Sequence, residues 1–198
     1  MTLHVSLADE ALLKASLDEA LRRAPFPVAH ADIWLFVYGA LAADPPFRPA
    51  ERRVATLAGY SRCFNIADPL NRGTAEAPGL VLGLERSGAC DGLAYRIEPG
   101  CLERDLMTVW RQEMRLPAYV PVWTEAHANL GPLPVLVFDT RREGPLYRPG
   151  LTDAAIAEWI AGSAGQAGAN VEYWRDTVEA FRRDGIHDPH LTAVGALI

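Results

Sequence analysis

The sequence contains the segment Trp34-Leu35-Phe36-Val37-Tyr38-Gly39-Ala40-Leu41, in which five bulky residues, three of them aromatic, precede a glycine. A short continuous run of this kind is typical of a buried strand. Gly39 ends the run and lets the backbone turn sharply or approach a ligand closely. The residues that follow, Ala42-Ala43-Asp44-Pro45-Pro46, have no periodicity and indicate a loop. A buried strand that ends in a glycine loop can gather several backbone N–H groups at one point, which suits an anionic or carbonyl oxygen.

The segments around this strand predict an α+β protein. We expect short strands, separated by turns that contain proline or glycine, at 33–38, 54–58, 61–66, 79–84 and 91–97. A helix at 100–115, strands at 119–127 and 133–138, and helices at 151–164 and 170–184 follow, and we expect Asn170 to cap the last helix. Because no crossover helices separate the first strands, a doubly wound parallel sheet is disfavoured. The pattern predicts a mostly antiparallel sheet, closed or half-closed into a barrel, with helices around it.

The first thirty residues predict a separate helical extension. Apolar residues recur at helical spacing between residues 6 and 24, Ser6 is a candidate cap with Asp9 three positions on, and Pro25 ends the helix. We expect this helix to dock on the surface of the following domain, and a role in dimerisation is the alternative. Residues 1–30 therefore form the extension, and residues 31–198 form the main domain.

Composition limits the classes of function. The chain has 198 residues, of which 49% are hydrophobic and 22% charged, with a net charge of −6, as in an ordinary globular domain. No basic patch with interleaved aromatic residues indicates a nucleic-acid partner, and no apolar stretch reaches the roughly twenty residues that span a bilayer. The three cysteines show no metal-type spacing and fit a reducing compartment. The acidic residues Asp9 and Glu10 stand where a signal peptide would be apolar, so we expect a cytoplasmic protein without membrane contact, monomeric or homodimeric.

Several motifs resemble one protein family. Tyr38-Gly39-Ala40-Leu41 is similar to the Tyr-Gly-Ser-Leu signature of the γ-glutamylcyclotransferase superfamily, and its surroundings resemble the ChaC branch, which cleaves glutathione. Further segments resemble ChaC proteins in the same order, from about Trp34 to Leu191: Gly59-Tyr60-Ser61-Arg62, Arg72-Gly73-Thr74, Gly79-Leu80-Val81-Leu82-Gly83-Leu84, Trp110-Arg111-Gln112-Glu113-Met114 and Asn170-Val171-Glu172-Tyr173. The resemblance implies a small mixed barrel with flanking helices.

Glu113 is the strongest candidate for a catalytic residue. It continues the apolar stripe of Leu102, Leu106 and Val109, near the C-terminal end of its expected helix. Burial and the negative end of the helix dipole would both raise the pKa of its carboxyl group, as a general acid/base near neutral pH requires. The alternative is a frayed helix end at which Glu113 is exposed or pairs with a neighbouring arginine. The resemblance favours catalysis, because the family's acid/base is the glutamate of an Arg-Glu motif on this helix.

The resemblance also implies a substrate-binding loop. The backbone of Tyr38, Gly39, Ala40 and Leu41 would cradle a γ-glutamyl group, with Tyr38 as part of the wall. Ala40 replaces the usual serine, which costs little if the loop acts through its backbone N–H groups. Gln112 replaces the usual arginine before the glutamate, which could alter the orientation of that carboxyl group.

Three further residues are weaker candidates. Arg72 follows an expected strand and could bind a substrate carboxylate bidentately, although a loop arginine in water is an equal alternative. Where the family has tyrosines at or behind its pocket, we assign Tyr147 to the pocket and treat Tyr173 as structural.

Other motifs carry less. His187-Asp188-Pro189-His190 resembles a metal site, but we expect Pro189 to break any helix there, and no third ligand is obvious. The glycines at 162, 165 and 168 follow a helix rather than a strand, which does not match a dinucleotide site. No residues are arranged as a covalent nucleophile and its base. We therefore expect no metal and no cofactor.

These observations predict an enzyme that acts on a small γ-glutamyl compound, with glutathione as the expected substrate. The α-amine of the substrate attacks its own γ-carbonyl group and releases 5-oxoproline and cysteinylglycine, so the enzyme needs an acid/base but no nucleophile. The alternatives are a cyclotransferase for another γ-glutamyl amine and a non-catalytic binding module that kept the fold.

Overall fold

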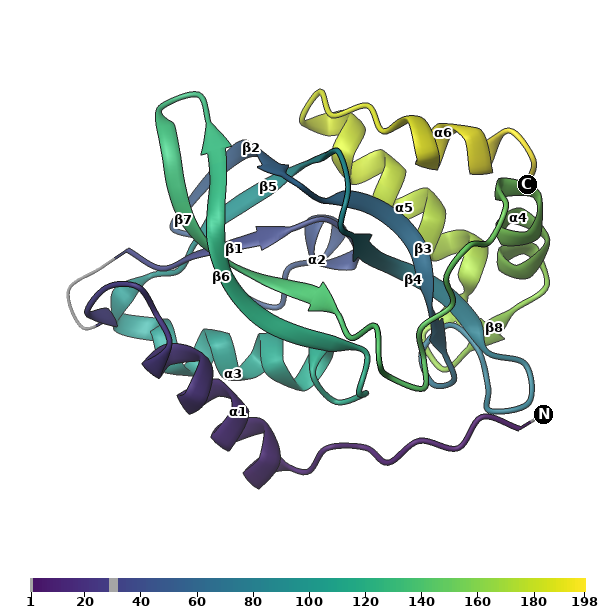
Figure 1. Cartoon of the computed structure of the whole chain (residues 1–198), viewed down its shortest axis with the longest axis horizontal. Helices are drawn as coiled ribbons and strands as arrows, with labels where there is room; N and C mark the ends of the chain where they lie inside the picture. Colours follow the sequence, from purple (N-terminus) through teal and green to yellow (C-terminus); the bar gives the residue numbers. More distant parts are fainter. Residues whose placement is uncertain (1, 29–31) are drawn as a thin grey trace.

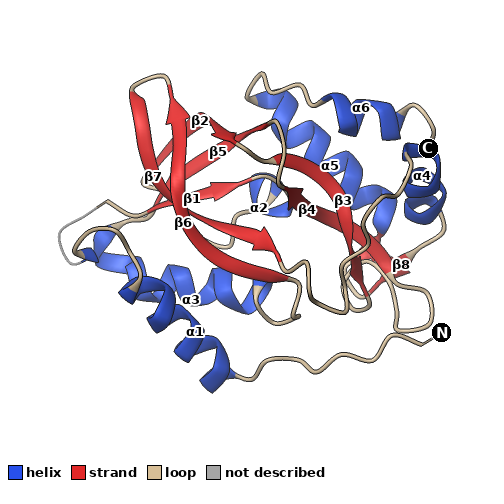
Figure 2. Ribbon diagram, viewed as in Figure 1, coloured by secondary structure: helices blue, strands red, loops and turns tan. Residues whose placement is uncertain are grey.

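A closed five-stranded barrel forms the centre of the computed structural model, which describes residues 2–28 and 32–198. Its strands are β1 (Trp34–Val37), β2 (Glu51–Ala58), β5 (Ala89–Arg96), β6 (Tyr119–Ala128) and β7 (Gly131–Thr140), in the order β1-β5-β2-β6-β7. Every pairing is antiparallel except the one that closes the barrel, where β1 meets β7 in parallel at Leu35 and Leu136. Figure 2 shows the strands and the helices around them. The predicted α+β class with a mixed, mostly antiparallel barrel is confirmed.

Strands β3 (Ser61–Asp68) and β4 (Gly79–Glu85) form a separate two-stranded antiparallel sheet. Among residues 2–28 and 32–198, no strand pairs with the second edge of β4, and side chains bind its backbone groups instead. Asn170 accepts from the N–H and donates to the C=O of Leu80, at 2.6 and 3.0 Å. The edge that would otherwise leave buried polar groups unpaired is therefore satisfied by residues distant in sequence.

The helices lie in two groups (Figure 1). Helix α3 (Leu102–Glu113), preceded by a 3-10 turn at Pro99–Cys101, packs with α1 (Glu10–Arg22) on one side of the barrel. Helices α4 (Asp153–Ala161), α5 (Asn170–Arg183) and α6 (Pro189–Gly195) lie on the side of β3 and β4, and a short hairpin, β8 (Ala164–Gly165) and β9 (Gly168–Ala169), joins α4 to α5. A helix of one turn, α2 (Ala40–Ala43), follows β1 and contacts α5.

The helices begin or lie differently from the sequence expectations at four places. Asp9, not Ser6, caps α1 and accepts from the N–H of Leu12 at 2.9 Å. Ala169, not Asn170, is the N-cap of α5, because the Asn170 side chain binds β4 instead. Pro189 begins a helix rather than breaking one, since a first helical position needs no N–H. Ala42 and Ala43, which we expected in a loop, belong to the helical turn Ala40–Ala43.

The N-terminal helix docks on the domain, as expected for an extension. Leu13, Leu17 and Ala20 are buried and belong to the common hydrophobic core. The indole N–H of Trp123 donates to the carbonyl of Ala20 at 2.7 Å. The boundary placed between residues 30 and 31 lies outside the described residues. None of the helices in residues 2–28 and 32–198 combines the length and apolar character that crossing a lipid bilayer requires.

Candidate active site

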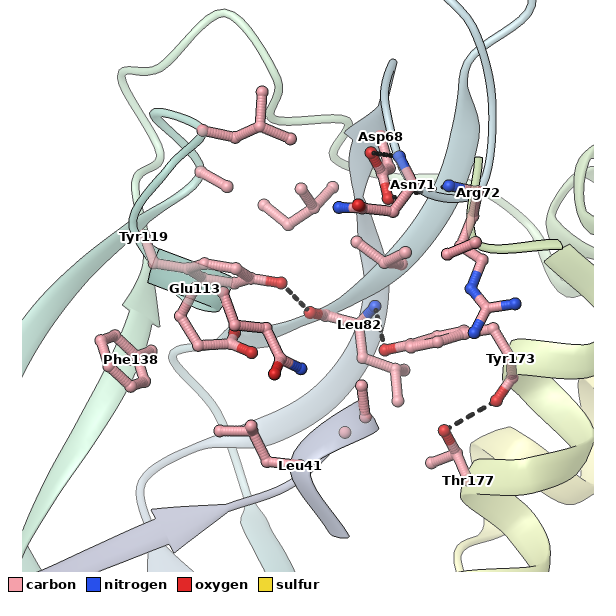
Figure 3. A pocket seen from close by; sticks show the side chains of 18 of the residues that line it. Leu41, Asp68, Asn71, Arg72, Leu82, Glu113, Tyr119, Phe138, Tyr173 and Thr177 are labelled. Atoms are coloured by element: carbon pink, nitrogen blue, oxygen red, sulfur yellow. Dashed lines mark hydrogen bonds between the residues drawn. The ribbon is translucent and has the colours of Figure 1, made fainter. Parts of the chain in front are cut away.

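A cavity of about 440 Å³ opens beside the barrel where several parts of the chain meet. This volume is within the range of small-molecule sites, roughly 300–1000 Å³. The end of β1 with α2, the last turn of α3, the loop between β3 and β4, the start of β6 and the first half of α5 all contribute side chains (Figure 3). The expected residues Tyr38–Leu41, Arg72 and Glu113 all line it.

Glu113 is the last residue of α3 and faces this cavity. Its side chain is only partly exposed, and burial raises the pKa of its carboxyl group to about 7, with the nearby negative charge of Asp68 as the second cause. Arg111 is turned toward α1, where it binds Glu10 through two hydrogen bonds of 2.8 and 3.0 Å. Across the described residues, no basic side chain forms an ion pair with Glu113, so no cation offsets its burial.

The backbone at the start of α2 forms one wall of the cavity. The carbonyl of Tyr38 accepts from the guanidinium of Arg62 at 2.7 Å, and its hydroxyl donates to the carbonyl of Phe138 at 2.5 Å. The N–H of Ala42 donates back to the carbonyl of Gly39 at 2.9 Å. In the described part of the chain, the N–H groups of Ala40 and Leu41 have no acceptor, as is usual in a first helical turn.

Three tyrosine hydroxyls surround this wall. Tyr119 donates to the carbonyl of Leu82 at 2.7 Å, and Tyr173 accepts from the N–H of Leu82 at 3.2 Å (Figure 3). A Cβ added to Gly39 would lie 3.1 Å from the Tyr173 hydroxyl, so glycine permits this close approach. Burial, more than any charge, raises the pKa of Tyr38, Tyr119 and Tyr173. The three hydroxyls therefore stay protonated near neutral pH.

Arg72 and Asn71 approach the cavity from the loop between β3 and β4. The Arg72 guanidinium lies 5.6 Å from the centre of the Tyr173 ring and donates to the carbonyl of Ala169 at 3.2 Å. Among the described residues it forms no ion pair with a carboxylate. Figure 3 shows Arg72 beside Tyr173 at one end of the cavity. Its remaining donors are therefore available to an anionic group.

Tyr147, which we expected at the pocket, lies elsewhere. Its hydroxyl donates to a carboxylate oxygen of Glu85 at 2.8 Å, and its backbone forms an isolated bridge with Ile66. It is not among the residues that line the cavity. The loop that precedes Tyr147 carries no periodic pattern, so its sequence does not indicate the direction of this side chain.

The motif from His187 to His190 makes contacts within the fold. Asp188 caps α6 and forms an ion pair with the buried Arg62, the arginine that holds the carbonyl of Tyr38. His190 accepts from the N–H of Phe64 at 3.4 Å and lies 3.2 Å from a carboxylate oxygen of Asp153. The motif thus ties the C-terminal helix to the strand beside the cavity.

The cavity residues that sequence reasoning missed include Asp68, Asn71, Tyr119 and Tyr173. Tyr173 was treated as structural, although Asn170 and Tyr173 stand three residues apart and therefore on one helix face. Both bind the backbone of β4. Asp68 is the last residue of β3, and Asn71 lies in the loop that follows it. Polar residues are ordinary where a strand passes into a turn, so they carry no sign of a site.

Comparisons with known proteins point to one family. A family model described as "ChaC-like protein" matches residues 33–198. The glutathione-specific gamma-glutamylcyclotransferase of Escherichia coli strain K12 is 31% identical over 160 residues, which cover 80% of this chain and 69% of that protein. The glutathione-specific gamma-glutamylcyclotransferase 1 of Danio rerio is 29% identical over 173 residues, which cover 84% of this chain and 88% of that protein.

The fold has the same relatives. The crystal structure of a yeast γ-glutamyl cyclotransferase specific to glutathione superposes with a TM-score of 0.77 at 21% identity and covers 85% of this chain and 96% of that one. The family resemblance of the motifs is thereby confirmed. The chain belongs to the ChaC-like family.

Proposed function

We propose that this protein is a γ-glutamylcyclotransferase that cleaves glutathione to 5-oxoproline and cysteinylglycine, with Glu113 as its general acid/base. The observation that carries the proposal is the carboxyl group of Glu113, which faces the cavity with a pKa raised to about 7 by burial. A group with this pKa holds a proton about half of the time at neutral pH, so it can both accept and donate one. We propose glutathione as the substrate because the relatives in Escherichia coli and Danio rerio are glutathione-specific enzymes.

The reaction needs one base, one acid and no nucleophile from the protein. Glu113 takes a proton from the α-ammonium group of the substrate, and the freed amine attacks the γ-carbonyl carbon to close a five-membered ring. The carbonyl oxygen becomes an oxyanion. When it collapses, the bond to the cysteinyl nitrogen breaks, and Glu113 returns its proton to that nitrogen. The ring nitrogen, which the attack leaves positively charged, releases its second proton to solvent and becomes the N–H of 5-oxoproline. The folded pose of the bound γ-glutamyl chain supplies the effective molarity of the attack.

The start of α2 supports the oxyanion. The N–H groups of Ala40 and Leu41 have no acceptor among the described residues, and both residues line the same cavity as Glu113. Fixed donors of this kind stabilise developing negative charge without reorganisation. Since these are backbone groups, Ala40 supplies the same donor as the serine that is usual in the family signature.

Arg72 is the proposed partner of a substrate carboxylate. Its guanidinium lies at the cavity without an ion pair to any described carboxylate and is held against the ring of Tyr173. A planar fork of donors suits bidentate binding of a carboxylate. Tyr38, whose hydroxyl is occupied by Phe138, contributes wall rather than chemistry.

A second cyclotransferase activity is the competing proposal. Gln112 stands where the family has arginine, and it lines the cavity next to Glu113. A change at this position favours a different leaving amine over a loss of activity, because the acid/base residue is retained. A binding module without catalysis has no use for a buried carboxyl group that lacks a cation.

The deciding experiment measures release of 5-oxoproline from glutathione and from a panel of γ-glutamyl amines and γ-glutamyl amino acids. The proposal expects the highest kcat/KM with glutathione. A higher value with another compound assigns a different leaving amine, and tight binding of glutathione without turnover supports the binding module instead. The same preparation, passed over a calibrated sizing column, distinguishes a monomer from a homodimer.

We also propose that the protein works in the cytoplasm. Its three cysteines are free, and a small-molecule thiol substrate is kept reduced in that compartment. Fractionation of cells that carry the tagged full-length chain tests this, and recovery from an exported fraction would contradict it.

A further inference from the structure

Asp68 is a buried carboxylate at the edge of the cavity, and the mechanism above does not use it. It ends β3, is 4% exposed and lines the cavity. Both of its oxygens accept hydrogen bonds from consecutive backbone N–H groups. One oxygen accepts from Leu70 and Asn71, each at 2.9 Å, and the other accepts from Arg72 at 3.1 Å.

These three bonds fold the start of the loop between β3 and β4. Other contacts then fix the rest of the turn, because the N–H of Ala167 donates to the carbonyl of Asn71 at 2.8 Å and a Cβ at Gly73 would lie 1.9 Å from the nitrogen of Gly79. The turn therefore has little freedom, and the side chains of Asn71 and Arg72 reach the cavity from it (Figure 3).

The charge of Asp68 also acts on Glu113. It is the second cause, after burial, of the raised pKa of Glu113, and it also contributes to the raised pKa of Tyr119 and Tyr173. The titratable and charged groups that share the cavity with Glu113 are Asp68, Arg72, the hydroxyls of three tyrosines, an aspartate that caps α2, an aspartate of α5, an arginine of α3 and an arginine just after α3. Apart from Asp68, Arg72 and Glu113, these groups are Tyr38, Asp44, Arg111, Arg115, Tyr119, Tyr173 and Asp176.

We propose that Asp68 is a positioning residue of the active site, whose carboxylate folds the turn that presents Asn71 and Arg72 and places a fixed negative charge opposite Glu113. This rests on the proposed function for its kinetic part only. The two effects are separable, because asparagine keeps the acceptor for Leu70 and Asn71 and removes the charge together with the acceptor for Arg72, whereas alanine removes all three hydrogen bonds and the charge.

The first test is a titration that needs no turnover. Glutamate labelled with ¹³C at the side-chain carboxyl carbon gives an NMR signal for Glu113, assigned by its loss in Glu113→Gln. In Asp68→Asn the midpoint of this signal falls below that of the parent, because the negative charge that opposed ionisation of Glu113 is gone. Asp9→Asn is the matched control, since Asp9 also accepts a backbone N–H three residues on but lies outside the cavity.

The second test separates the turn from the charge by kinetics with glutathione. Asp68→Asn keeps KM within about threefold and raises the ratio of kcat/KM at pH 6 to that at pH 8 by at least ~threefold, equal to half a pH unit in the acid limb. Asp68→Ala raises KM more than tenfold, because the turn loses its three hydrogen bonds and no longer holds the side chains of Asn71 and Arg72 in place at the cavity. If the asparagine variant does not fold, Asp68→Ser takes its place as an uncharged acceptor.

The outcomes are distinct from those of the proposed function. A Glu113 midpoint in Asp68→Asn equal to that of the parent and of Asp9→Asn overturns the electrostatic part, whether or not glutathione is cleaved. Equal KM values for Asp68→Ala and the parent overturn the part that concerns the turn. If the parent releases no 5-oxoproline, the proposed function fails, while the titration still decides whether Asp68 acts on Glu113.

Discussion

Glu113 is an ionisable residue in a place from which water is largely excluded, and such residues are usually exposed to solvent. Its position at the end of α3 makes the charged form costly, and the nearby Asp68 adds to that cost. The fold tolerates this because the protonated carboxyl group is less expensive to bury than the carboxylate. The same energetic cost prepares the group to exchange a proton near neutral pH.

Replacing Glu113 by glutamine should remove catalysis and keep the fold. Glutamine is nearly isosteric but cannot carry the proton, so we expect 5-oxoproline release to fall by at least about a hundredfold. Glu103→Gln is the matched control, because Glu103 is an exposed glutamate on the same helix, outside the cavity. Turnover by Glu113→Gln at the rate of the control would show that another group is the acid/base.

The pH dependence of stability follows from the same residue. The pKa of Glu113 rises from 4.5 to about 7 on folding, so the folded protein holds more protons than the unfolded chain between these values. Stability is therefore lost as pH rises through this window, by up to about 3 kcal/mol. Glu113→Gln lacks this loss, and urea unfolding should show its advantage over the parent to be larger at pH 8 than at pH 5. An advantage independent of pH would contradict the raised pKa.

Ala40 tests whether the loop acts through its backbone. Ala40→Ser keeps the N–H at the start of α2 and adds only a hydroxyl. We expect kcat/KM for glutathione to change by less than tenfold, or less than about 1.4 kcal/mol in the barrier. A larger gain would assign the missing hydroxyl a direct role in the reaction.

At the scale of elements, one edge of β4 forms its backbone hydrogen bonds with side chains, whereas the barrel strands form theirs with neighbouring strands. Asn170 binds both backbone groups of Leu80, Tyr119 and Tyr173 bind those of Leu82, and Thr140 accepts from the N–H of Leu84 at 2.8 Å. Two of these side chains are also cavity residues. Tyr173 therefore both lines the cavity and connects helix α5 to strand β4.

Removing one of these side chains should weaken the whole domain. Asn170→Ala leaves the N–H and C=O of Leu80 buried without partners, and each orphaned group costs roughly 1–3 kcal/mol. We expect a loss of about 2–5 kcal/mol in the free energy of unfolding. Gln166→Ala, which removes an exposed amide from the adjacent turn, is the control and should change it by less than about 0.5 kcal/mol. Equal losses in the two variants would contradict this account of β4.

At the scale of the molecule, the N-terminal helix and the barrel share one core. Leu17 of α1 is fully buried, and the indole of Trp110 on α3 donates to the hydroxyl of Ser16 at 3.3 Å. The backbone of residues 2–9 is also tied to the domain, through Leu3 to Ala75 and through Ala8 to Arg115, at 2.8 and 2.9 Å. We therefore propose that residues 1–30 are an extension in sequence that unfolds together with residues 31–198.

Leu17→Ala tests this cooperativity. Loss of a fully buried leucine should lower the free energy of unfolding by ~2–5 kcal/mol, with a single transition in both circular dichroism and tryptophan fluorescence. Leu12→Ala, on the exposed face of the same helix, is the control and should have little effect. An early transition confined to α1 would instead make the extension an independent unit.

The sequence by itself determined the elements and the identity of the catalytic candidate. The periodic patterns placed the seven main strands and the helices α1, α3, α4 and α5 to within a few residues, because the period of apolar residues directly reflects which face is buried. The same pattern put Glu113 on an apolar stripe. These are local properties, and local sequence is enough to predict them.

Only the tertiary structure decided which distant groups meet. Asp68 and Glu113 come from separate elements, Asn170 leaves its expected cap to bind Leu80, and Tyr147 turns to Glu85 rather than to the cavity. A polar side chain in a turn or at a helix end has several partners of similar energy, and the packing of the elements selects among them. The sequence pattern therefore identified the carboxyl group of Glu113, but it could not identify Asp68 as the charge that raises the pKa of this group.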